Sequence, residues 1–245
     1  TGDTVARFSV SERWLVGGCQ SGQIIMWDAE TFARKGIEFE GNAEPVLCLA
    51  ISERDDILAA GGGQFPPEKS VGNVRIWDLT SGNRLASMRQ VDPVMDVILT
   101  HDGERTLVTS ACLDGSIRRG DIASGEMMRL IRDKDSGLVA VRHLPDGNRI
   151  VTLGPESGVK VWGLDETVHP SAPAIFRASD ANVTSMAVSP DGKQIASGGH
   201  DRVVTLWDVD EQKNIATLSA ENDGWLPLAP LRSLAVSQDG SRIVV

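Results

Sequence analysis

The chain has 245 residues, 41% of them hydrophobic, so it is long enough to bury a sizeable core, and its apolar runs are too short to span a membrane. Its 24 basic and 34 acidic residues give a net charge of −10, which argues against a nucleic-acid phosphate backbone as a partner. We therefore expect no nucleic acid and no membrane among its partners. Tyrosine is absent, yet six tryptophans stand beside five phenylalanines, which indicates a repeated use of tryptophan.

A segment of 14 residues recurs along the chain. In chain order the copies are Leu15–Asp28, Leu58–Asp78, Val108–Asp121, Ile150–Gly163 and Ile195–Asp208. The second copy aligns once Gln64–Ser70 is treated as an insertion. The last positions of the copies are 50, 43, 42 and 45 residues apart, and removing the seven-residue insertion brings the first interval to 43. A period of this length predicts a repeat architecture.

A second landmark precedes each copy and ends in a turn. At Val183–Gly192 the residues alternate as in a strand, and Pro190-Asp191-Gly192 then supplies a tight turn. Similar stretches are Val94–Gly103, Leu138–Gly147, Leu231–Gly240 and, more loosely, Val5–Trp14 and Val46–Asp55. Further strands are expected around 195–197, 203–207 and 214–218, which makes four antiparallel strands per unit.

Four strands in about 43 residues are typical of a propeller blade. The sequence therefore predicts an all-β protein, a β-propeller segment of five blades and the first two strands of a sixth. The approximate blade limits are 1–41, 42–89, 90–133, 134–178, 179–220 and, for the partial blade, 221–245.

The repeated Ser-Pro-Asp-Gly, Ser-Gly-Gly-x-Asp and Leu-Trp-Asp sequences resemble the WD-repeat β-propeller family, and the resemblance covers essentially the whole chain. It implies that the tryptophan of each blade packs inside the blade, where a loop Asp and a strand Ser or Thr form hydrogen bonds. The motif positions that it assigns are Trp27, Asp28, Trp77, Asp78, Ser110, Asp114, Asp121, Thr152, Trp162, Ser197, Asp201, Trp207 and Asp208.

The chain departs from the family pattern in several blades. Gly120 replaces the tryptophan of the third blade, and Glu156 occupies the loop position of the fourth. The family's histidine is replaced at every aligned position, by Asn42, Gln90, Lys134 and Ser179. The resemblance thus implies that no blade has the full hydrogen-bond network, and we expect some blades to be held mainly by apolar packing.

The resemblance also raises the question of closure. The sixth unit stops at Val245, in its second strand, whereas the family's common ring has seven blades. Open sheet edges favour association. We therefore expect the remaining strands to belong to a larger polypeptide, and we expect the 245-residue chain alone to dimerise or aggregate.

No catalytic or metal-binding pattern stands out. The four histidines lack a His-x-x-x-His spacing, and Gly61-Gly62-Gly63 lacks the Gly-Lys-Ser/Thr of a phosphate-binding loop. We expect no cofactor, no metal and no enzymatic activity. The three cysteines, Cys19, Cys48 and Cys112, are odd in number and lie in apolar or glycine-rich stretches. They indicate buried thiols in a reducing compartment, the cytoplasm, with the nucleus left open.

Two unrepeated segments are candidates for partner binding. The insertion Gln64–Ser70 carries Phe65, and the connection Glu221–Pro230 carries Trp225. In a propeller both would emerge on the same face, where the two aromatic side chains either anchor a partner or fold back over the blade. Arg118 and Arg119 form either a small basic binding spot or part of a solvated face.

Three functions remain open at this point. The favoured one is a non-catalytic scaffold whose loops bind proteins or peptides, as the resemblance implies. The second is a sensor or regulatory repeat array in a larger signalling protein, such as a nucleotide-binding ATPase or a protein kinase; sequence upstream of Thr1 would separate the two. The third is a propeller hydrolase, which is disfavoured because the innermost strands offer His143 alone as a metal ligand or catalytic group.

Overall fold

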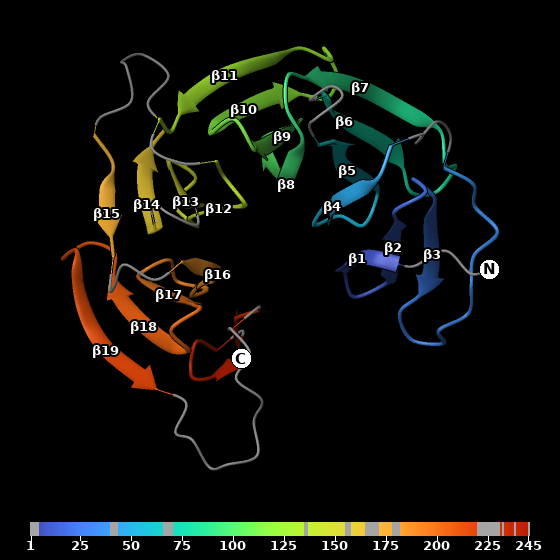
Figure 1. Cartoon of the computed structure of the whole chain (residues 1–245). Coiled ribbons are helices and arrows are strands. Elements are labelled where there is room, and N and C mark those ends of the chain that lie inside the picture. The colour runs from blue at the N-terminus through green and yellow to red at the C-terminus, as the bar shows by residue number, and fades with distance from the viewer. Residues whose placement is uncertain are drawn as a thin grey trace. The chain divides into compact units, whose positions relative to one another are not determined.

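The computed structural model describes residues 5–39, 44–65, 71–134, 137–154, 158–164, 172–177, 182–219, 231, 233–237 and 239–244, and the regular elements within them are all β-strands. The strands form antiparallel sheets in which chain neighbours lie side by side (Figure 1). The fold is all-β as predicted, and the four-stranded sheets are built like propeller blades. Among the described residues no helix is long and apolar enough to cross a membrane.

The chain divides into two compact units. The first, Thr1–Arg132, contains one three-stranded and two four-stranded sheets. Their strands are β1 (Val5–Val10), β2 (Trp14–Cys19) and β3 (Ile24–Asp28); β4 (Val46–Ile51), β5 (Ile57–Gln64), β6 (Val71–Asp78) and β7 (Arg84–Gln90); and β8 (Val94–Asp102), β9 (Arg105–Cys112), β10 (Ser116–Asp121) and β11 (Met127–Arg132).

The second unit, Asp133–Val245, contains two four-stranded sheets and one two-stranded sheet. Their strands are β12 (Ala140–His143), β13 (Arg149–Gly154), β14 (Gly158–Gly163) and β15 (Ala174–Phe176); β16 (Val183–Val188), β17 (Gln194–Gly199), β18 (Val203–Asp208) and β19 (Lys213–Ser219); and β20 (Ala235–Val236) and β21 (Ile243–Val244). The partial sixth unit therefore has the two strands that were expected.

The first sheet differs from the expectation of four strands. In the described part of the chain after β3, a single bridge between Trp27 and Arg34 stands in place of a fourth strand. The reason lies in the apolar residues that follow, because Ile37 and Phe39 pack into the core of the next sheet. The Phe39 ring meets the fully buried Trp77 edge to face, with centroids 6.0 Å apart.

A serine and an aspartate fix the hairpin turns between the first and second strands of several sheets. Before β17, the Ser189 hydroxyl donates to the Asp191 carboxylate at 2.6 Å and accepts from the Gln194 amide at 2.9 Å. Gly192 supplies the positive φ, 71°, that the turn requires. Ser237 and Asp239 repeat this arrangement before β21. The recurring aspartates therefore shape turns, which explains their period in the sequence.

The core lies between successive sheets of each unit. In the first unit one apolar cluster joins the β1–β3 and β4–β7 sheets, and another joins β4–β7 to β8–β11. In the second unit a cluster joins β12–β15 to β16–β19, and a smaller one joins β16–β19 to β20–β21. Each sheet is thus stabilised mainly by the burial of its faces against its neighbours.

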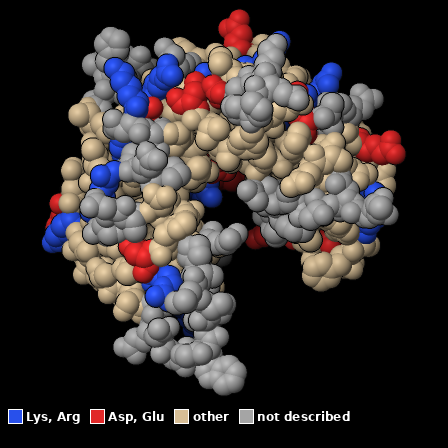
Figure 2. All heavy atoms as spheres, in the orientation of Figure 1, with Lys and Arg blue, Asp and Glu red and all other residues tan. Residues whose placement is uncertain are grey.

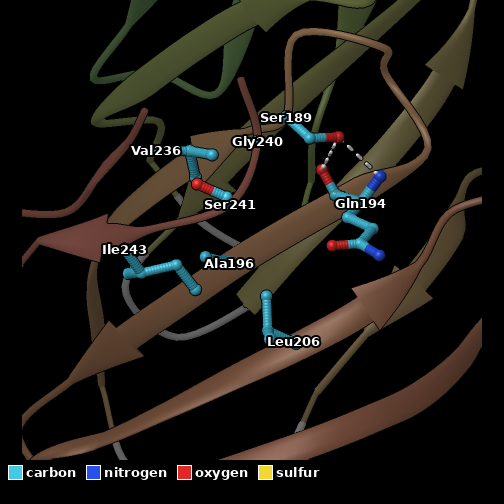
Figure 3. A pocket seen from close by; sticks show the side chains of 8 residues that line it. All are labelled: Ser189, Gln194, Ala196, Leu206, Val236, Gly240, Ser241 and Ile243. Carbon is cyan, nitrogen blue, oxygen red and sulfur yellow. Dashed lines mark hydrogen bonds between the residues drawn. The ribbon is translucent and has the colours of Figure 1, made fainter. Parts of the chain in front are cut away.

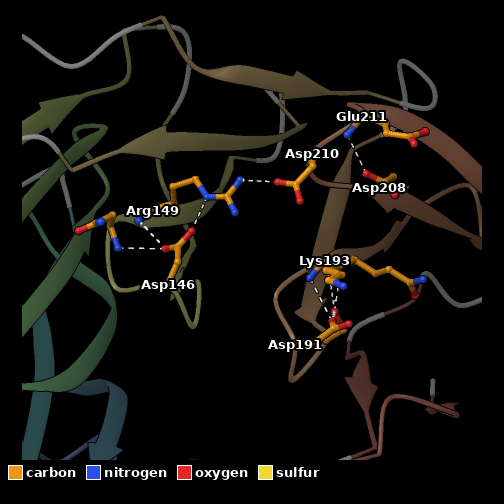
Figure 4. Close-up of polar contacts among 10 residues, drawn as sticks. Asp146, Arg149, Asp191, Lys193, Asp208, Asp210 and Glu211 are labelled. Atoms are coloured by element: carbon orange, nitrogen blue, oxygen red, sulfur yellow. Dashed lines mark hydrogen bonds and ion pairs between the residues drawn. The ribbon is translucent and has the colours of Figure 1, made fainter.

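A charged contact adds to the packing of the two complete sheets in the second unit (Figure 4). Arg149, at the start of β13, binds Asp146 in its own turn at 2.5 Å and Asp210, in the turn after β18, at 2.9 Å. These side chains are between 35% and 65% exposed, so the pairs orient the turns more than they stabilise the fold.

Candidate interaction surface

The β5–β6 hairpin carries the predicted insertion and extends beyond the usual strand length. Both of its strands have eight residues, whereas β17 and β18 at the same place in their sheet have six. Gln64, the first inserted residue, is still paired with Val71. Phe65 follows immediately, and residues 66–70 lie outside the described residues.

Glycines hold the end of this hairpin tightly between two other segments. A Cβ atom on Gly72 would lie 1.9 Å from the carbonyl oxygen of Asp92, and one on Gly62 would lie 2.3 Å from that of Pro45. No side chain fits at either position. The hairpin end is therefore packed against the segment before β4 and the segment after β7. The glycine run 61–63 lies within β5.

Two apolar side chains are exposed at this end of the sheet. Phe65 is 48% exposed, and Val91, in the connection that packs on the hairpin, is 66% exposed. Phe65 lies three residues after Gly62 and Val91 lies next to Asp92, so both follow closely on the packed part of the backbone. Val91 was not predicted, because a single valine in a connection carries no distinguishing pattern. Trp225, the second predicted anchor, lies outside the described residues.

The predicted basic spot is altered by pairing inside the sheet. The Arg118 side chain is 13% exposed, pairs with Asp114 at 3.4 Å and donates to the Cys112 sulfur at 3.2 Å. The Nε atom of Arg119 is buried with no hydrogen-bond partner in the described part of the chain. Arg118 is therefore neither on a solvated face nor available as a basic contact.

In the second unit the motif tryptophan forms a hydrogen bond with the motif serine or threonine of the same sheet. Trp207 Nε1 donates to the Ser197 hydroxyl at 2.8 Å, and Trp162 Nε1 donates to Thr152 at 2.8 Å. Both bonds are buried and join the third strand of a sheet to its second. In the first unit Trp77 has Ala60 at the corresponding position, and the hydroxyl of Ser110 reaches only the Arg118 carbonyl, at 3.5 Å. Trp27 is half-buried and stands opposite Leu15.

The aspartates of the motif form turns and loops. Asp28 accepts from the Thr31 amide at 3.0 Å, and Asp78 accepts from the Ser81 amide at 2.7 Å. The Thr31 amide and hydroxyl and the nearby Lys35 hold the pKa of Asp28 at about 2, and the Ser81 donors lower the pKa of Asp78. The remaining motif aspartates also accept hydrogen bonds from backbone amides of their own turns and loops. The pairs of acceptor and donor residue are Asp121 and Ala123, Asp208 and Glu211, Asp114 and Ser116, and Asp201 and Val203.

Buried ion pairs occupy a position that sequence reasoning missed. Three residues before the last position of the repeat, consecutive sheets carry a cation bound to a carboxylate. The pairs are Arg75–Glu44 at 2.9 Å, Arg118–Asp114 at 3.4 Å and Lys160–Asp133 at 2.8 Å. The Lys160 and Asp133 side chains are only 3% and 1% exposed. We expected some blades to be held mainly by apolar packing, and that expectation did not include these ion pairs. The recurrence of a cation at one repeat position could have indicated them.

The described residues contain no group of three or more His, Cys, Asp or Glu side chains placed to hold a metal ion. His169 and Glu156 lie outside them. On the face seen in Figure 2, the described basic and acidic side chains lie interspersed rather than gathered in a field of one sign. The exposed apolar end of the β4–β7 sheet is the candidate interaction surface.

Comparison with known proteins places the repeat in a family. Residues 172–208 match the family model described as WD domain, G-beta repeat. This segment is a WD40 repeat. The match runs from just before β15 to the end of β18, so one WD40 repeat contributes the last strand of one sheet and three strands of the next. It confirms the predicted resemblance at this repeat.

One curated relative is similar over a short stretch. It is a probable serine/threonine-protein kinase, roco6, from Dictyostelium discoideum, and it is 37% identical over 71 residues. The match covers 29% of this chain and 3% of the relative, so the chain spans a small part of that protein's length.

Proposed function

We propose that the protein is a non-catalytic scaffold that binds a protein or peptide partner at the hairpin end of the β4–β7 sheet. One observation carries this proposal: Phe65 is 48% exposed directly beyond a hairpin whose glycines pack it against two neighbouring segments. A large apolar side chain on a fixed backbone is the usual anchor of a protein interface, because little conformational freedom is lost on binding. The WD40 repeat supports the same class of function.

The absence of catalytic activity is part of the proposal. The motif carboxylates are engaged by amides and hydroxyls of their own turns, as Asp28 and Asp78 are. A carboxylate held in this way has a lowered pKa and is a poor general acid or base near neutral pH.

Site-specific photo-crosslinking tests the proposed surface. A photoreactive phenylalanine analogue is placed at position 65 or, as a matched control, at position 32. Phe32 is also exposed, at 71%, but lies in the turn after β3, at the end of its sheet opposite the second-to-third strand hairpin. We expect position 65 to capture a defined protein from native lysate, and unlabelled wild-type chain to compete with it better than a Phe65→Ala chain does. Equal capture at both positions would contradict the proposal.

A second candidate is a regulatory repeat array within a larger signalling protein. The similarity to a probable serine/threonine-protein kinase favours it, although the shared stretch is short. No disulfide joins Cys19, Cys48 or Cys112, which supports our further proposal of an intracellular location, cytoplasmic or nuclear. Sequencing the gene upstream of Thr1 discriminates the candidates, because a regulatory array would be fused to a catalytic domain.

A further inference from the structure

Alternate side chains of β7, the outermost strand of the β4–β7 sheet, form one exposed row. Leu85, Ser87 and Arg89 are exposed, whereas the residues between them are buried or half-buried. Side chains of a strand alternate between its two faces, so these three lie on the same face. The alternation continues one step past the strand, where Val91 is 66% exposed. These four residues, the β7 row, therefore lead along the strand to the hairpin end that carries Phe65.

The backbone edge beside the β7 row is open. Within the described residues β7 pairs with β6 alone (Figure 1). Alternate backbone amides and carbonyls of such a strand point away from its sheet and can pair with a further strand. An extended segment can therefore add to the sheet at β7, with its main chain held by hydrogen bonds and its alternate side chains beside the β7 row.

The charge of β7 indicates which kind of segment fits. The strand carries two arginines and no acidic residue, in a chain whose net charge is −10. Arg84 and Arg89 are exposed, and neither forms an ion pair with a described carboxylate. Positive charge along a strand edge favours an acidic partner. It disfavours a second copy of this chain, because pairing two β7 edges would gather the arginines of both copies with no carboxylate between the two strands.

The outermost strands of the other four-stranded sheets differ at the position of Arg89. In β19 the register puts Ser219 there, and Lys213, the charged residue of that strand, is already in an ion pair. In β11 it puts Arg132 there, where the charge of Asp114 lies close enough to interact. β15 has three residues and no charge. Of these described strands, β7 is therefore the one whose exposed row combines apolar side chains with an unopposed cation.

The pocket between the β16–β19 and β20–β21 sheets offers no comparable selectivity (Figure 3). It has a volume of about 110 Å³, and the described residues that line it include no charged side chain. The hydroxyl of Ser189, one of its polar groups, is already bound to Asp191 in its own turn. The β7 row, with a cation between apolar side chains, specifies its ligand more closely.

We propose that β7 is the docking strand for an extended acidic peptide, which adds antiparallel to its open edge with a carboxylate beside Arg89 and apolar side chains beside Leu85 and Val91. The inference rests on the proposed function, because Val91 belongs to both surfaces and the peptide is the partner class for that site. Main-chain hydrogen bonds supply affinity, and the side chains opposite the β7 row supply specificity.

The antiparallel direction fixes the order of residues in the peptide. The side chain opposite Val91 comes first, the one opposite Arg89 follows two residues later, and the one opposite Leu85 follows after four more. The expected pattern is therefore an apolar residue, an acidic residue two positions on, and a second apolar residue four positions beyond that.

A library of random ten-residue peptides displayed on phage tests the pattern. Selection on the 245-residue chain is expected to enrich peptides with this apolar and acidic order. Selection on an Arg89→Glu chain is expected to replace the acidic residue by a basic one. Lys213→Glu, on the outermost strand β19, is the matched control and is expected to leave the acidic preference unchanged. Failure to enrich any common pattern, or an acidic preference that Arg89→Glu leaves intact, would overturn the proposal.

Hydrogen exchange with a synthetic peptide of the most enriched sequence tests the docking mode. We expect alternate amides of residues 85–91 to exchange at least about tenfold more slowly when the peptide is bound, and Arg89→Glu to weaken binding at least about tenfold. Protection elsewhere with β7 unchanged would overturn the proposal. So would protection of β7 without peptide in a dimer detected by light scattering, because a second copy would then be the occupant.

Phe65→Ala separates this inference from the proposed function. Enriched peptides that lack an acidic residue and lose binding in Phe65→Ala would support the Phe65 surface and overturn strand addition at β7. An acidic peptide that protects β7 and binds the Phe65→Ala chain as tightly as the wild-type chain would support strand addition and contradict the role of Phe65.

Discussion

The β8–β11 and β16–β19 sheets derive from the same repeat but use different interior groups. In β16–β19 the Trp207 indole binds Ser197, and the third strand carries no cation beside it. In β8–β11 Gly120 takes the tryptophan position, Met127 lies close to it, and Arg118 pairs with Asp114. The repeat therefore fixes the backbone and leaves the interior polar contact open to substitution.

The β12–β15 sheet combines both solutions and shows that they are compatible. Trp162 binds Thr152, and Lys160, two residues before Trp162 and opposite Thr152, pairs with Asp133. The Lys160 ammonium also lies 6.0 Å from the centre of the Trp162 ring. The ion pair and the indole bond therefore occupy the same sheet face.

The largest effect is expected at the buried ion pair. Asp133→Asn leaves the Lys160 ammonium without its carboxylate in a site only 3% exposed, and should cost about 3–5 kcal/mol of unfolding free energy. Urea unfolding measures it. Replacing the pair together, Lys160→Met with Asp133→Leu, should recover most of the loss. The exposed Lys213–Glu211 pair is the control, and Glu211→Gln there should have no measurable effect. Similar losses in the two pairs would contradict this ranking.

The next largest effect is a difference in stability between two variants at the same repeat position, Ser197→Ala and Ser110→Ala. Ser197→Ala leaves the buried Trp207 indole without its acceptor and should cost about 1–3 kcal/mol. Ser110→Ala removes only a contact to a carbonyl at 3.5 Å and should cost less than about 1 kcal/mol. Thermal unfolding of both variants checks the order. A greater loss for Ser110→Ala would show that its hydroxyl has a role the geometry does not reveal.

A third prediction concerns the glycine that replaces tryptophan. A Cβ atom on Gly120 would lie 2.6 Å from the Glu126 carbonyl oxygen and 2.8 Å from Met127, so Gly120→Ala should destabilise the chain by about 1–3 kcal/mol. Gly36→Ala is the matched control, since nothing lies within 4 Å of its Cβ position. The urea midpoints of unfolding of the two variants are compared with that of the wild-type chain. An unchanged midpoint for Gly120→Ala would mean that β10 and β11 move apart to accommodate the methyl group at little cost.

The smallest effect is a pH dependence at the turns. The folded pKa values of Asp28 and Asp239 are about 2, below the ordinary 3.8, because amides and hydroxyls donate to the charged carboxylates. The stabilisation is therefore fully present above about pH 4 and is lost as the pH falls through 2. Asp28→Asn and Asp239→Asn should each flatten the acid side of the stability profile. A profile unchanged by both substitutions would show that these turns do not contribute.

Much of the fold could be predicted from the repeat, because alternating residues and recurring turns set the strands. The absence of a fourth strand from the described part of the first sheet could not be predicted, because it depends on the contact between Phe39 and Trp77 of another sheet. Of the candidate site, Phe65 was identified from the insertion. Its supporting contact at Gly72 depends on the distance to Asp92, far along the chain, which no local pattern encodes. The Lys160–Asp133 pair was missed because its two residues lie 27 positions apart in the sequence.

The binding affinity of the partner captured at position 65 gives the most direct test of the scaffold proposal. Calorimetry would compare the wild-type chain, Phe65→Ala and Phe32→Ala. We predict at least about tenfold weaker binding for Phe65→Ala, about 1.4 kcal/mol, and unchanged binding for Phe32→Ala. Equal affinities for all three chains would contradict the assignment of the binding surface to the hairpin end of the β4–β7 sheet.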